Sequence, residues 1–130
     1  MTVAEYLSNQ APDRAEALTA IHDMVMETNK KLAADVSKMM GADMIIYTLK
    51  KQFVYALGSG KKHMSLHVLP MYMVKTIHEK YEKLFPKAKF QKGCINFSHA
   101  NEMPPAVVHQ LLTECAQVDM QSIMENRKKK

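Results

Sequence analysis

Four carboxylates between residues 13 and 27 are the first candidates for chemistry in this chain: Asp13, Glu16, Asp23 and Glu27. If the segment is helical, they fall within an arc of roughly 80°, on the side opposite Leu18, Ile21 and Val25. Open carboxylate surfaces bind hard or borderline cations weakly, because a tight site needs ligands that converge from several directions. The stripe predicts either a weak metal site or an ordinary solvent-exposed helix face with acidic residues near the helix N-terminus.

A second candidate lies in KHMSLHVL, where apolar and polar residues alternate as in a strand. His63, Ser65 and His67 share one face of this strand. The two histidines stand about 13 Å apart, which is too far for both to bind one ion at Zn–N distances of about 2.0–2.1 Å. Each histidine can still supply a single ligand, or the three residues can line a small-molecule pocket. An ordinary polar sheet face is the alternative.

Other motifs carry no recognisable chemistry. Gly60-Lys61 matches only the end of a phosphate loop, because Lys62 stands where Ser or Thr is required, so residues 58–61 predict a hairpin turn. Cys94 and Cys115 lack CxxC spacing and predict small apolar core residues. The twelve methionines predict core fillers rather than copper ligands. Without a nucleophile, base and acid that belong together, the sequence favours a binding protein over an enzyme.

Composition indicates a single globular domain. The chain has 130 residues, of which 47% are hydrophobic and 24% charged. No apolar run approaches the roughly 20 residues of a membrane span, and the first residues lack a secretory signal, so we expect a cytoplasmic protein. The net charge of +5 comes largely from the four basic residues at 127–130, which opposes a nucleic-acid-binding face. We expect one domain over 1–120 and a flexible basic tail over 121–130.

The spacing of apolar residues predicts three helices at the start of the chain. Thr2 and Glu5 have the spacing of a capping box, which predicts a short first helix. Pro12 suits the first turn of a longer second helix that reaches to about Lys30. A third, shorter helix is predicted around residues 32–40, and it ends at Gly41.

The second half of the chain predicts strands and two more helices. Three short runs rich in β-branched and aromatic residues predict a meander: DMIIYTL, QFVYALG and KHMSLHVL. A helix over 71–85, a strand at GCINFS and a last helix that begins at Pro104 and Pro105 complete the order. The predicted fold is α+β, with a largely antiparallel four-stranded sheet made of the meander and one further strand.

Three segments carry a resemblance to a known family: TVAEYLSNQAPDRAEAL, KKHMSLHVLP and KFQKGCINFSHANEMPPAVVHQLL. In this order, over about residues 2–117, they resemble the YdhG-like domain family of small bacterial cytoplasmic proteins. The resemblance implies a compact α+β domain without an established enzymatic activity. Some relatives are described as frataxin-like iron chaperones, which implies weak Fe(II) binding by the acidic stripe and delivery to an iron-accepting protein.

The sequence leaves other functions open beside iron delivery. A surface that delivers iron is usually strongly acidic, whereas this chain has a sequence pI of about 9.2. One alternative is a small-ligand or enzymatic site on the sheet face with His63, Ser65 and His67. Another is a protein–protein interaction module with an exposed apolar patch.

Overall fold

The computed structural model describes residues 1–39, 41–120 and 122–123. Its helices are α1 (Val3–Ser8), α2 (Pro12–Thr28), α3 (Leu69–Met73), α4 (Lys75–Leu84), the 3-10 helix η1 (Ala100–Glu102) and α5 (Pro105–Ala116). Its strands are β1 (Ala33–Met39), β2 (Ala42–Leu49), β3 (Gln52–Ser59), β4 (Met64–Val68), β5 (Lys89–Phe90) and β6 (Cys94–Phe97). The strands form one antiparallel sheet in the order β1-β2-β3-β4-β6-β5. The predicted α+β class with an antiparallel sheet is confirmed.

The predicted number of strands and the predicted element order are wrong, chiefly because residues 32–40 were expected to form a helix. All seven residues of β1 instead have partners in β2. Ala34 and Val36 pack against the core, so this short segment gains both ladder hydrogen bonds and apolar contacts. Gly41 has a φ of +82°, but its left-handed conformation serves the β1–β2 hairpin instead of a helix end.

Two smaller differences lie between residues 69 and 90. The single helix predicted over 71–85 is divided into α3 and α4, because Val74 is extended, with φ −116° and ψ 95°. Strand β5 was not predicted, since its two residues are too few to produce a periodic pattern. With β1 and β5 added, the described part of the chain forms a six-stranded sheet rather than a four-stranded one.

Several local predictions are confirmed. The Thr2 hydroxyl accepts from the Glu5 N–H, and the Glu5 carboxylate accepts from the Thr2 N–H, as a capping box requires. A hairpin joins β3 to β4, as predicted, but Gly58 and Ser59 are paired residues of β3, so the turn lies at residues 60–63, where the Gly60 N–H donates to the His63 carbonyl at 2.9 Å. Within the described residues, no helix has both the length and the apolar character that a bilayer span needs. Apart from residues 122 and 123, the predicted tail over 121–130 lies outside the described residues.

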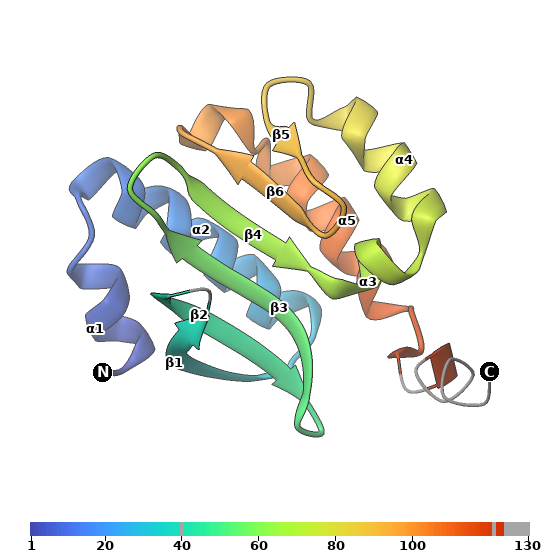
Figure 1. Ribbon diagram of the computed structural model, residues 1–130, viewed down its shortest axis with the longest axis horizontal. Helices are drawn as coiled ribbons and strands as arrows, with labels where there is room; N and C mark the ends of the chain where they lie inside the picture. Colours follow the sequence, from blue (N-terminus) through green and yellow to red (C-terminus); the bar gives the residue numbers. More distant parts are fainter. Residues whose placement is uncertain (40, 121, 124–130) are drawn as a thin grey trace.

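The helices cover one face of the sheet. Figure 1 shows α2 and α5 crossing behind the strands, while no described helix lies in front of β3 and β4. The covered face carries large side chains such as Tyr47, Tyr55 and Leu66, each at most 1% exposed. They belong to one apolar core with residues of α2 and α5, including Leu18 and Leu111. No helix that the structure describes covers the opposite face of the same strands.

Candidate functional site: a cavity on the open sheet face

The uncovered sheet face has its smallest side chains in the middle. Along β3, Ala56 and Gly58 point away from the helices, because they alternate with residues that belong to the core. On β4, Ser65 lies opposite Gly58 and His67 lies opposite Ala56. Ala56 and Gly58 therefore form a shallow strip along β3. Larger side chains border it, from β2 on one side and from β4 on the other.

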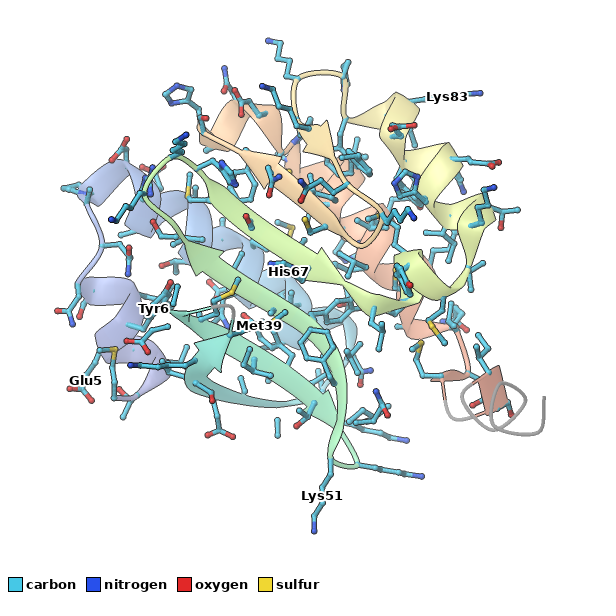
Figure 2. The ribbon with its side chains drawn as sticks, viewed as in Figure 1. Glu5, Tyr6, Met39, Lys51, His67 and Lys83 are labelled. Atoms are coloured by element: carbon cyan, nitrogen blue, oxygen red, sulfur yellow. The ribbon has the colours of Figure 1, made fainter. Side chains whose placement is uncertain are left out.

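A cavity of about 120 Å³ opens at this strip, and we call it the sheet-face cavity. Its lining includes Met39 from β1, Met44 from β2 and Gly58 from β3, together with Ser65 and His67 from β4. Figure 2 shows the Met39 and His67 side chains on the near face of the sheet. Two of the three residues predicted for this face thus meet in one site.

The third residue predicted for this face, His63, does not line the cavity. It precedes the first residue of β4, and its carbonyl closes the β3–β4 turn. The sequence did not identify Met39 and Met44 as site residues, because all twelve methionines were expected to fill the core.

The Met44 side chain lies across Gly58. A Cβ atom added at Gly58 would stand 2.7 Å from Met44 Cγ and 2.8 Å from Met44 Cε. The thioether sulfur joins these two carbon atoms, so it also lies over the backbone of β3. A side chain at position 58 would displace it. Because Gly58 has no side chain, the Met44 thioether can lie against the β3 backbone, where Met44 lines the cavity.

His67 presents a neutral imidazole to the cavity. Burial lowers the pKa of its ring below the ordinary histidine value. Within the described residues, no hydrogen bond or ion pair engages the ring. Ser65 differs, because its hydroxyl donates to the Asn96 side-chain oxygen at 2.7 Å. A neutral imidazole with an available nitrogen is the form of histidine that binds metal ions.

Two residues from the N-terminal helices fasten the rim of the cavity. One guanidinium nitrogen of Arg14 donates to the Ser59 hydroxyl and to the Gly60 carbonyl, both at 2.6 Å. The Ser59 N–H donates to the Tyr6 hydroxyl at 2.9 Å. The β3–β4 turn is thus held to α1 and α2. Arg14 is the only arginine before residue 127. This was the only feature of the sequence that could have drawn attention to Arg14 as a residue that holds the turn.

Cys94 lies beside His67 in the register of β4 and β6. Its thiol donates to the Gln91 side-chain oxygen at 3.0 Å, and burial raises the pKa of the thiol. The group is therefore protonated at neutral pH, which opposes a role as a nucleophile. Cys94 is not among the residues that line the sheet-face cavity, so we leave it out of the candidate ligands.

The acidic stripe on α2 remains spread along the helix. All four carboxylates are exposed, and Asp13 and Glu27 stand about 21 Å apart along the helix axis. Glu16 and Asp23 border an open groove of about 630 Å³ between α1 and α2, whereas the other two do not. Among the described residues, no three His, Cys, Asp or Glu side chains lie close enough together to hold a metal ion. Metal binding by the stripe stays a prediction.

His22, which lies beside the stripe in the sequence, turns toward the core. Its Nδ1 shares a hydrogen bond of 2.7 Å with the Tyr47 hydroxyl. Burial lowers the pKa of His22, with Asp23 opposing this shift. Because the ring is engaged by a buried tyrosine, it does not extend the carboxylate surface.

Comparisons of the chain with protein-family models, with curated proteins and with solved structures gave no match. The YdhG-like resemblance therefore stays a prediction based on its motifs. A functional proposal has to rest on the chemistry of the sites themselves.

Proposed function

We propose that the protein is a non-enzymatic binding module that holds a soft metal ion, Cu(I), in the sheet-face cavity. One observation carries this proposal: Met39, Met44 and His67 line the same small cavity on a face that no described helix covers. Thioether sulfur atoms favour Cu(I) over hard cations, and imidazole is a common partner ligand for copper. The three side chains come from three different strands, and all of them line this one cavity.

The size of the cavity favours an ion over an organic ligand. Sites for drug-sized molecules usually measure about 300–1,000 Å³, whereas the sheet-face cavity measures about 120 Å³. Methionine side chains are flexible and adapt to an ion with little strain. The low pKa of His67 adds to this, since protons compete weakly for its nitrogen at neutral pH.

The alternative, Fe(II) delivery by the α2 carboxylates, lacks a comparable observation. Its four carboxylates do not converge, and weak binding without a cage offers little selectivity. We also propose that the protein belongs to the YdhG-like family and lies in the cytoplasm. A reducing cytoplasm would keep copper as Cu(I). The metal-accepting partner protein remains part of the same proposal.

The test is an anaerobic titration of the protein with Cu(I) in competition with a chromophoric chelator. Met44→Leu removes a sulfur atom at similar volume, and His67→Gln removes the imidazole. The matched controls are Met26→Leu and His109→Gln, which change a partly buried methionine and an exposed histidine outside the cavity. We expect each cavity variant to weaken Cu(I) binding at least tenfold and each control to stay within twofold.

Fe(II) and Zn(II) titrations of the same proteins separate the two metal proposals. An equal loss of Cu(I) affinity in the controls would show binding to scattered methionines and would reject the sheet-face site. Saturable Fe(II) binding that is lost in the double variant Asp23→Asn, Glu27→Gln would move the function to α2. Cu(I) binding no tighter than that of Zn(II) would also reject the proposal.

A further inference from the structure

A second cavity lies between α3, α4 and the connection from β5 to β6. Its volume of about 420 Å³ falls within the range of about 300–1,000 Å³ that is typical of small-molecule sites. We call it the basic cavity, and its lining residues are Met71, Tyr72, Met73, Lys75, His78 and Lys92. It shares no lining residue with the sheet-face cavity.

The described residues that line the basic cavity include two lysines and no acidic residue. Lys75 begins α4 and Lys92 follows β5, so the two ammonium groups come from separate segments. Neither lysine forms an ion pair or a side-chain hydrogen bond with a described residue. Within the part of the chain that the structure describes, the cavity therefore carries two cations without a partner, and this arrangement attracts an anion.

The backbone around Lys92 is held in place on two sides. The His78 Nε2–H donates to the Gln91 carbonyl at 2.9 Å, and this bond ties the connection to α4. The Val68 N–H donates to the Gly93 carbonyl at 2.8 Å, and this bond ties it to the end of β4. Lys92 thus stands on an anchored turn at the edge of the cavity.

The same cavity has an aromatic and apolar wall. Tyr72 is 50% exposed, which makes it one of three large hydrophobic residues with high exposure in the described chain. Its side chain packs against Gly93, where an added Cβ would stand 3.2 Å from Tyr72 Cβ. Met71, which also lines the cavity, is fully buried. An exposed aromatic ring in a cavity with a buried apolar side chain offers a surface on which a flat apolar group packs well.

We propose that the basic cavity binds a phosphate monoester that carries an aromatic ring. The phosphate lies between Lys75 and Lys92, and the ring packs against Tyr72. Two ammonium groups match the charge of a phosphate dianion, and each donates charge-assisted hydrogen bonds. The aromatic wall supplies the selectivity for an organic phosphate over inorganic phosphate.

Phenyl phosphate is a suitable first probe, because it contains both elements in their simplest form. Calorimetric titration of the full chain is compared for phenyl phosphate, benzoate, phenol and inorganic phosphate at constant ionic strength. We expect saturable binding of phenyl phosphate at least fivefold tighter than that of any of the other three. Lys75→Gln and Lys92→Gln should each weaken it at least fivefold. Tyr72→Leu should weaken phenyl phosphate while leaving inorganic phosphate within twofold.

Lys83→Gln and Lys87→Gln are the matched controls, since both lysines are exposed and neither lines the cavity. Figure 2 shows the Lys83 side chain directed away from the rest of the molecule. Equal losses in the controls would mean that surface charge alone attracts the anion, and they would overturn the proposal. Absence of saturable phenyl phosphate binding, or equal binding of benzoate, would do the same. Circular dichroism of each variant verifies that the fold is retained.

Discussion

The two faces of the sheet are built from alternating residues of the same strands, yet their side chains differ in kind. On the covered face, Leu66 and Val68 of β4 are fully buried against the helical layer. On the open face, Ser65 and His67 of the same strand are only half-buried and line a cavity. One short strand thus supplies apolar core side chains on one face and polar, cavity-lining side chains on the other.

The comparison also explains why the open face tolerates small residues. The covered face must fill the space between sheet and helices, so it carries tyrosine, leucine and isoleucine side chains. Among the described elements, none forms a layer against the open face. Gly58 and Ala56 can occupy its centre without leaving an internal void. We therefore expect substitutions to separate by face, with effects on stability on one side and effects on binding on the other.

The largest expected effect comes from Leu66→Ala, with its neighbour His67→Ala as the matched change on the other face. Leu66 is fully buried in the core, so truncation should lower the free energy of unfolding by about 3 kcal/mol. His67→Ala should cost less than about 1 kcal/mol, because the half-buried ring makes no hydrogen bond with a described residue. Urea denaturation of both variants measures the difference. Equal costs would mean that the open face is packed as tightly as the core.

A smaller effect is expected where Met44 crosses Gly58. Gly58→Ala places a methyl group 2.7 Å from Met44 Cγ, so the methionine must move. We expect a cost of about 1 kcal/mol, most of which disappears when Met44→Ala is combined with it, since residues in contact are coupled. A double-mutant cycle by denaturation measures this coupling. Additive effects within about 0.3 kcal/mol would show that the two residues do not constrain one another.

The smallest expected effect concerns pH and compares one histidine from each side of the sheet. Burial lowers the pKa of both His22 and His67 in the folded protein. The unfolded chain therefore takes up protons first as the pH falls below about 6.5, so the free energy of unfolding decreases with decreasing pH in that window. His67→Gln should remove only its own share of this dependence. Denaturation at about pH 7.5 and about pH 5.5 measures it.

Adding Cu(I) should separate the contributions of His22 and His67 to the pH dependence of stability. If the ion binds the neutral His67 ring, saturating Cu(I) should steepen the pH dependence of stability in the parent protein and leave it unchanged in His67→Gln. His22, which is bonded to Tyr47 in the core, should contribute equally with and without the ion. A metal-dependent change that persists in His67→Gln would contradict the sheet-face site.

Local patterns were sufficient to predict several features of the fold. The capping box at Thr2 and Glu5 and the hairpin between β3 and β4 depend on residues a few positions apart, and both are confirmed, although the turn itself begins at Gly60. Residues 32–40 show the limit of such patterns. A short segment with weak periodicity takes its structure from whatever it pairs with, and β1 pairs with β2 along its whole length.

The alternation in KHMSLHVL by itself determined that Ser65 and His67 share one face, because neighbouring side chains in a strand always point in opposite directions. Only the tertiary structure decided which face the helices cover, and which side chains join His67 there. Met39 reaches the cavity because β1 is a strand, and Met44 reaches it because Gly58 is its cross-strand neighbour. Such neighbours are set by the register between strands, which depends on the packing of the whole sheet and not on local sequence.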